Sequence, residues 1–172
     1  IIDSKLLSNS FNINCIKFTT DDNKTYIAKY YYLKIDKFNA IKSEVENLKF
    51  LNKLKLDYFP IVHPRSNQDF LIMSFINNDS ITPNEISKDL LNAITKIHSC
   101  ENNFYGFYFD TQIGGLKQKN ESNNNWVNFY REKRLGYIYK IISTSNQMDR
   151  SINNKIELLL KNLENYIPQN PK

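Results

Sequence analysis

The sequence is poor in the residues that mark several common classes of protein. It contains 4 glycines, 2 cysteines and 2 histidines among 172 residues. Two cysteines do not make a disulfide framework or a metal site, so Cys15 and Cys100 are expected to be free thiols. No apolar run approaches the roughly 18 residues that a membrane helix needs, and no charged-then-apolar leader opens the chain. The sequence therefore predicts a cytoplasmic protein that has no membrane partner.

The charge pattern argues against nucleic acid as the main partner. A net charge of +5 and a pI near 9.0 permit an anionic ligand. The 23 basic residues are nevertheless spread along the chain beside 18 acidic ones, without a block of like charge. Tyr and Phe occur 11 times each, which is too often for a disordered chain. Because Ile1 rather than Met stands first, we also expect the chain to belong to a longer sequence.

The first part of the chain predicts a small antiparallel sheet with one helix. Residues 12–18 and 25–33 are rich in β-branched, apolar and aromatic residues on either side of a polar turn, which is typical of a hairpin. Apolar residues then recur with a helical period over residues 37–54. Two short apolar runs, 61–62 and 70–73, suit a second hairpin.

The remainder of the chain predicts helices. Residues 82–85, Thr-Pro-Asn-Glu, have the form of a capping box with proline at the first helical position. A loop over residues 105–125 and two helices over residues 126–142 and 152–167 follow. We therefore predict an α+β fold of two lobes, residues 1–76 and residues 77–172. The core of the helix at 126–142 is predicted to include Trp126, Val127, Tyr130, Tyr137, Ile138 and Ile141.

Lys29 and Glu44 are candidates for an internal ion pair. Lys29 lies in an otherwise apolar and aromatic strand. Glu44 lies between Ile41 and Leu48, at the border of the apolar stripe of its helix. A charge on an apolar face is unfavourable unless it is paired. Protein-kinase-like folds use such a strand lysine and helix glutamate to hold the phosphates of ATP. The alternative is an exposed lysine and a solvated glutamate.

Three further segments have a nucleotide-binding or a purely structural interpretation. Residues 7–12 would form the turn that approaches the phosphates, or an ordinary polar turn. The strand at 70–76 would lead into a hinge where residues 73–75 offer backbone donors and acceptors to adenine, and it also suits a core strand. His98, near a helix end, is typical of a packed or capping residue rather than a catalyst.

The most specific pattern lies between Phe104 and Leu135. It reads Y-G-F-Y-F-D-T-Q-I-G from residue 105, Q-K-N from residue 118, W-V-N-F-Y from residue 126, and R-L from residue 134. These segments resemble F-G-F-x-x-D-N-x-I-G, Q-x-N, W-x-x-F-F and R-L of the fructosamine kinase (ketosamine-3-kinase) family, in the same order. Weaker upstream matches are residues 44–51, similar to E-A-x-G-L-x-x-L, and residues 97–99, similar to L-H-x.

The resemblance implies an aminoglycoside-phosphotransferase-like, protein-kinase-like fold: a β-sheet lobe with one helix, and the first helices of an incomplete helical lobe. It implies phosphorylation of a sugar hydroxyl on a ketosamine or glycated protein, with ATP and Mg²⁺. Lys29 would be the ATP lysine, with Glu44 as its helix partner. By position, the implied ATP-binding residues are Lys29, Glu44, Met73, Ser74, Phe75, Ser8 and Asn9. Asp110 and His98 are implied to be structural residues near the active site.

The chain also departs from the family pattern. Ser8-Asn9 replaces the glycine pair of the phosphate turn, Ser74 the hinge glutamate, and Thr111 the asparagine of D-N. The catalytic loop H-G-D-L-W-x-G-N and a later metal-binding aspartate have no counterpart in the sequence. Phosphoryl transfer needs a group that orients the hydroxyl and ligands for Mg²⁺. We therefore expect these groups beyond Lys172, and no turnover by these residues alone.

Three alternatives remain open at this stage. One is a non-catalytic, pseudokinase-like binding module. Another is a related phosphotransferase acting on choline or an aminoglycoside, against which the Y-G-F-x-x-D segment argues. The third is a basic nucleic-acid-binding protein, whose affinity would fall steeply with salt.

Overall fold

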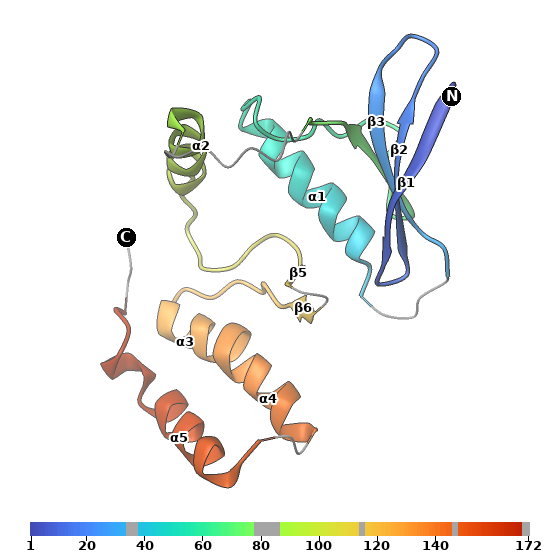
Figure 1. The fold of residues 1–172 in the computed structure, drawn as a ribbon. Helices are drawn as coiled ribbons and strands as arrows, with labels where there is room; N and C mark the ends of the chain where they lie inside the picture. Colours follow the sequence, from blue (N-terminus) through green and yellow to red (C-terminus); the bar gives the residue numbers. More distant parts are fainter. Residues whose placement is uncertain (34–37, 78–86, 114–115, 146–147, 170–172) are drawn as a thin grey trace. The chain divides into compact units, whose positions relative to one another are not determined.

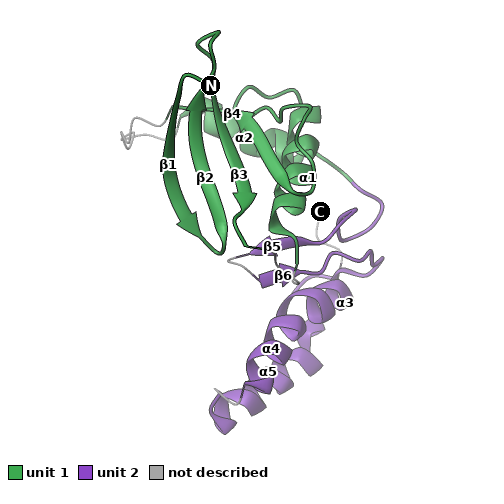
Figure 2. Ribbon diagram, turned by 90° about the vertical axis from the view of Figure 1, so that its right-hand side faces the viewer, with its two compact units in different colours: residues 1–101 green, residues 102–172 purple. Residues whose placement is uncertain are grey.

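The computed structural model describes residues 1–33, 38–77, 87–113, 116–145 and 148–169. The chain divides into two compact units, Ile1–Glu101 and Asn102–Lys172 (Figure 2). The lobe boundary predicted at residue 76 stays a prediction, because the segment that follows it lies outside the described residues. Within the described ranges, no helix is both long and apolar enough to cross a membrane.

The first unit is built on a four-stranded antiparallel sheet in the order β1-β2-β3-β4 (Figure 1). The strands are β1 Asp3–Ser10, β2 Ile13–Thr19, β3 Thr25–Tyr31 and β4 Phe70–Ser74. The β2–β3 pair confirms the first predicted hairpin. The second is confirmed in a shorter form, since Val62 makes an isolated bridge with Met73 beside β4.

The β1–β2 turn is tighter than the sequence predicts. Only Phe11 and Asn12 lie outside the two strands, and their φ angles of 52° and 62° are typical of a two-residue type I′ turn. Asn12 is held by Tyr32, whose backbone N–H and hydroxyl donate to its carbonyl and side-chain oxygens at 3.1 Å each. The prediction that residues 7–10 also belong to the turn is wrong, because ladder pairing with β2 extends β1 to Ser10.

Helix α1, Ala40–Lys53, covers one face of the sheet and supplies half of the core. The side chain of Asn39 caps it by accepting from the N–H of Lys42 at 2.9 Å. The helix predicted over residues 37–54 is therefore confirmed from residue 40. The buried core residues are Ile41, Val45 and Leu48 of the helix and Ile27, Leu71 and Met73 of the sheet.

Helix α2, Lys88–His98, ends the first unit. The Ser87 side chain accepts from the N–H of Leu90 at 3.1 Å, while the predicted capping box at 82–85 lies outside the described residues. Ala93 is buried. The predicted apolar face is present but exposed, including Leu90 and Ile94.

The second unit contains a small hairpin followed by helices. The hairpin pairs β5, Thr111–Ile113, with β6, Leu116–Gln118, inside the segment predicted as a loop. The predicted helix at 126–142 comprises α3 Trp126–Tyr130, a π-helical turn Arg131–Leu135 and α4 Gly136–Thr144. The last predicted helix comprises α5 Arg150–Lys161 and a 3₁₀ turn Leu163–Asn165.

The π turn explains one wrong prediction about the core. Ile138 and Ile141 are 39% and 37% exposed, although a constant helical period places them on the stripe of the buried Val127. A π turn holds more residues than an α turn, so it rotates the residues of α4 relative to that period. Gly136 permits the turn, since a Cβ there would lie 2.3 Å from the carbonyl oxygen of Arg131.

We expect Gly136→Ala to destabilise the protein despite the higher helix propensity of alanine. The added methyl group has to displace the backbone of Arg131, and overpacking of this kind costs about 1–3 kcal/mol. Urea denaturation followed by circular dichroism measures the loss of unfolding free energy. Lys140→Ala, at an exposed position of α4, is the matched control. Equal stability of Gly136→Ala and wild type would contradict the close approach.

Candidate functional site

Lys29 and Glu44 form the predicted ion pair. Lys29 lies on β3 and Glu44 on α1, and their Nζ and Oε1 atoms are 2.5 Å apart. The side chains are 26% and 31% exposed, so the pair is neither buried nor freely solvated. The packing of α1 on the sheet brings together two charges that are 15 residues apart in the sequence. The alternative of an unpaired lysine and glutamate is wrong.

The strand register places Ser8, and not Asn9, on the same face as Lys29. Ser8 pairs with Cys15, and Cys15 pairs with Lys29. Residues directly opposite one another in neighbouring strands share a face of the sheet. Asn9 pairs with Asn14 and lies on the opposite face, because side chains alternate along a strand. A nucleotide role for either residue stays a prediction.

Some backbone groups of the predicted adenine hinge already make hydrogen bonds within the first unit. The N–H of Ser74 donates to the carbonyl oxygen of Ile61 at 2.9 Å, and its hydroxyl oxygen accepts from the N–H of Ile61 at 2.9 Å. The N–H of Phe75 donates to the carbonyl oxygen of Thr25 at 3.2 Å. These two N–H groups are therefore engaged within the protein. The prediction that Met73, Ser74 and Phe75 line an adenine remains a prediction.

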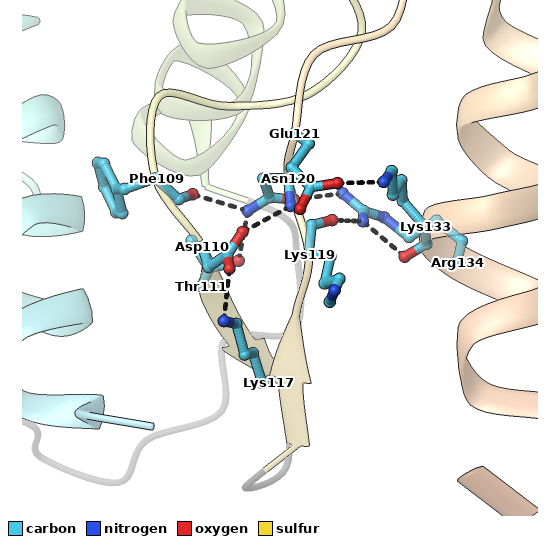
Figure 3. A network of polar contacts seen from close by, with 9 residues as sticks. All are labelled: Phe109, Asp110, Thr111, Lys117, Lys119, Asn120, Glu121, Lys133 and Arg134. Carbon is cyan, nitrogen blue, oxygen red and sulfur yellow. Dashed lines mark hydrogen bonds and ion pairs between the residues drawn. The ribbon is translucent and has the colours of Figure 1, made fainter. Parts of the chain in front are cut away.

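A second constellation lies in the second unit around the buried amide of Asn120 (Figure 3). Its Nδ2 donates to the carbonyl oxygen of Phe109 at 3.1 Å and to the hydroxyl of Thr111 at 2.9 Å. Its Oδ1 accepts from Nη2 of Arg134 at 2.6 Å. Its backbone N–H donates to Asp110 at 2.9 Å. The side chain thus ties the strand β5 to the π turn.

Arg134 completes this constellation from the π turn. Its Nη1 donates to the carbonyl oxygen of Lys119 at 2.6 Å, and its guanidinium lies 4.5 Å from the ring centre of Phe129. Burial lowers the pKa of Arg134 from its usual value. The neighbouring Lys133 pairs with Glu121. The sequence indicated these residues only through the Q-x-N and R-L motifs, which did not reveal that they bond to each other.

Asp110 is charged within this constellation. Burial acts to raise the pKa of the Asp110 carboxyl, but hydrogen bonds from the side chain of Lys117 and the N–H of Asn120 outweigh it. The pKa is therefore below its usual value. The carboxylate lies 2.8 Å from Nζ of Lys117. Asp110 thus braces the loop, whereas its predicted place near an active site stays a prediction.

Gly106 brings the Y-G-F-x-x-D segment into contact with the Q-x-N segment. Its φ of 132° is strained for other residues, and a Cβ would lie 2.6 Å from the carbonyl oxygen of Asn120. The N–H of Phe107 donates to that same oxygen at 3.0 Å. The Y-G-F-x-x-D, Q-x-N and R-L segments are therefore parts of one packed arrangement.

His98 and the possible metal ligands add nothing to either constellation. His98 is the exposed last residue of α2, so its proposed place near an active site stays a prediction. In the part of the chain that the structure describes, no group of three or more His, Cys, Asp or Glu side chains could hold a metal ion. The thiols of Cys15 and Cys100 are both free.

Comparison with known proteins connects these arrangements to a family. Residues 10–171 match the family described as "Fructosamine kinase". The chain belongs to the fructosamine kinase family. The predicted resemblance to this family is therefore confirmed, and the segments between Phe104 and Leu135 that suggested it form the arrangement around Asn120.

Named relatives in the fructosamine kinase family are distant in sequence. A protein of Vibrio cholerae named "Probable ketoamine kinase" is 25% identical over 139 residues, which are 78% of this chain and 47% of that protein. "Protein-ribulosamine 3-kinase, chloroplastic" of Arabidopsis thaliana is 31% identical over 96 residues, 55% of this chain and 28% of that protein. The chain spans about half the length, or less, of these curated relatives.

Two solved structures named "putative fructosamine-3-kinase" share the fold. One, from Haemophilus somnus, has a TM-score of 0.72 and 20% identity, covering 97% of this chain and 57% of that one. The other, from Thermobifida fusca, has a TM-score of 0.79 and 16% identity, covering 99% and 58%. The α+β, kinase-like fold predicted for this fructosamine kinase family member is therefore confirmed.

We expect Asn120→Ala to destabilise the protein by about 2–3 kcal/mol. The change leaves a guanidinium donor, a hydroxyl and a carbonyl without their partner in a buried place, and unsatisfied buried groups cost energy of this order. Thermal and urea denaturation measure the loss. Asn124→Ala, at an exposed position of the same segment, should change stability little. A similar small change in both variants would contradict a central role for Asn120.

The lowered pKa of Asp110 predicts a specific pH dependence. A folded-state pKa below the unfolded value means that ionised Asp110 stabilises the fold above the unfolded pKa, and that this stabilisation is lost as the pH falls through the folded pKa. Asp110→Asn should therefore be less stable than wild type at pH 7, and the difference should shrink below pH ~4. The other carboxylates are the same in both proteins, so their contributions to the pH dependence cancel when the unfolding free energies of wild type and Asp110→Asn are subtracted. A difference that is independent of pH would contradict the assignment.

Proposed function

We propose that this chain is the nucleotide-binding part of a kinase that transfers phosphate from ATP to a sugar hydroxyl of a ketosamine. The observation that carries the proposal is the Lys29–Glu44 ion pair, in a chain of the fructosamine kinase family. A strand lysine held by a helix glutamate is the arrangement with which kinase-like folds bind the α- and β-phosphates of ATP. The names of the ketoamine and ribulosamine kinase relatives support the substrate class.

The residues present fit the phosphates of ATP. Lys29 is partly exposed, so its ammonium can meet a phosphate while Glu44 keeps it in place. Ser8 lies two strands away on the same face of the sheet and would add a hydroxyl donor on that face. The adenine would lie against residues 73–75. Since the N–H groups of Ser74 and Phe75 donate to the carbonyl oxygens of Ile61 and Thr25, carbonyl groups of this segment would accept from the adenine amino group.

The reacting groups would come from outside residues 1–172. The sequence has no His-Gly-Asp segment, and the described residues include no metal-binding cluster. Bound Mg²⁺ would neutralise the charge that develops on the transferred phosphate. This stretch would therefore bind and orient ATP, and the base that orients the sugar hydroxyl would belong to a segment corresponding to the additional length of the relatives.

We expect ATP with Mg²⁺ to raise the melting temperature of the protein, and Lys29→Ala to weaken this effect. Loss of a charge-assisted contact to phosphate should reduce ATP affinity about tenfold or more. Thermal shift and calorimetric titration measure both. Lys161→Ala, an exposed lysine of the second unit, removes the same charge and should retain wild-type affinity.

The outcomes separate the possible functions. ATP binding that depends on Lys29, without phosphorylation of fructosyl-lysine by residues 1–172, is the expected result. Phosphorylation by residues 1–172 alone would contradict an external catalytic segment. No ATP effect, or an equal effect in Lys29→Ala and Lys161→Ala, would contradict the nucleotide site itself. A full-length protein that phosphorylates choline or an aminoglycoside but not fructosyl-lysine would contradict the substrate class.

A further inference from the structure

Lys17 lies at the end of the sheet face where the proposed function puts the adenine. It stands on β2 directly opposite Ile27 of β3, and Ile27 stands directly opposite Met73 of β4. Residues opposite one another in neighbouring strands share a face of the sheet. Ile27 and Met73 both belong to the core that packs against α1. Lys17 is therefore on the α1 face, which also carries Lys29.

The ammonium group of Lys17 lies over the ring of Phe75. Its Nζ is 4.0 Å from the ring centre, which is the geometry of a cation–π interaction. Phe75 is itself packed against the core of the first unit, so the position of the ring is set from below. Among the residues that the structure describes, no carboxylate pairs with this ammonium. The contact with Phe75 therefore fixes where the charge lies.

This contact occupies the place of a stacked base. The proposed function puts adenine against residues 73–75, and Phe75 has the only aromatic ring among them. A base that stacks on an aromatic side chain lies against a face of the ring. The ammonium of Lys17 covers the face that is turned toward β2, while other parts of Phe75 pack against the core. An entering base therefore has to displace the ammonium.

Displacement of the ammonium has different consequences for neutral and for charged ligands. A cation–π contact at a partly exposed site changes an equilibrium constant by about twofold to tenfold, and every base loses this amount. Lys17 is offset from Lys29 by one strand and two residues, roughly 5 Å and 7 Å. Phosphates bound at Lys29 are thus about one Debye length, ~8 Å, from the displaced charge and attract it. A nucleoside has no phosphates and gains no such compensation.

We propose that Lys17 is a specificity-determining residue that disfavours neutral nucleosides and favours nucleotides. Its ammonium holds the place of the base on Phe75. When a nucleotide binds, the phosphates at Lys29 attract the displaced ammonium and offset the loss of its contact with the ring. This role of Lys17 rests on the proposed ATP site, to which it adds a residue whose effect depends on the charge of the ligand.

Adenosine and ATP with Mg²⁺ are the probes, and Lys17→Val is the test variant. Valine suits a strand, but it is uncharged and too short to cover the ring of Phe75. Amide chemical shifts of the isotope-labelled chain, followed by NMR during each titration, give both dissociation constants. We expect Lys17→Val to bind adenosine about twofold to tenfold more tightly than wild type. The gain for ATP should be smaller, because the charge that attracts the phosphates is also lost.

Two variants and one spectroscopic signal isolate the contact. Lys17→Arg keeps a cation over Phe75 and should retain the wild-type preference for ATP over adenosine within about twofold. Lys5→Val removes a charge from the exposed position directly opposite Lys17, and it should change the affinity for neutral adenosine less than about twofold. In ligand-free wild type, the Phe75 ring should shift the proton resonances beside Nζ of Lys17. Adenosine should return them toward the values of an exposed lysine.

The outcomes separate the role of Lys17 from the proposed function. ATP binding that depends on Lys29, with equal adenosine affinity in wild type and Lys17→Val, would overturn the role of Lys17 and leave the ATP site in place. Weaker adenosine binding by Lys17→Val would overturn it as well, since Lys17 would then be a donor to the base. Adenosine binding by Lys17→Val without ATP binding by wild type would support the role of Lys17 and contradict the proposed function. Absence of both ligands from every variant, with native amide spectra, would overturn both.

Discussion

The packing of α1 on the sheet is the constraint on which the first unit depends. Ile41 and Leu71 are fully buried and Val45 is 1% exposed, so the helix has one position on the sheet. That position brings Glu44 to Lys29. The ion pair is therefore a consequence of one apolar contact, and a shift of the helix on the sheet would alter it.

The second unit depends on a polar contact instead. Asn120 is 3% exposed, and its side chain makes hydrogen bonds with Phe109 and Thr111 at the start of β5 and with Arg134 of the π turn. A buried amide is unfavourable unless its partners are present, so it selects one arrangement of the surrounding loop. The three basic side chains of the π turn all make polar contacts within the second unit. Arg131 donates to the carbonyl oxygen of Leu160, Lys133 pairs with Glu121, and Arg134 donates to Asn120. Part of the positive charge of the chain is therefore already paired within the protein.

The position of polar groups relative to the sheet limits how a nucleotide could be bound. Ser8 shares a face of the sheet with Lys29, whereas the backbone N–H groups of Ser74 and Phe75 already donate to Ile61 and Thr25. The turn at Phe11 and Asn12 is fixed by bonds from Tyr32 rather than left open by glycine. At the proposed ATP site, a phosphate would therefore approach a short turn that is already fixed by hydrogen bonds, and side-chain donors would contribute more than a flexible backbone loop.

The sequence alone determined α1, the β2–β3 hairpin and the family. Periodicity predicts α1 and the β2–β3 hairpin because one residue in two or one in 3.6 faces the core. Spacing alone made Lys29 and Glu44 only candidates for a pair, which the packing of α1 on the sheet brings together. The motifs from Tyr105 to Leu135 indicate the family directly. Only the tertiary structure decided the register that separates Ser8 from Asn9, the π turn at Gly136 and the bonds of Asn120. These features arise where segments distant in the chain meet, and a local pattern carries no information about such contacts.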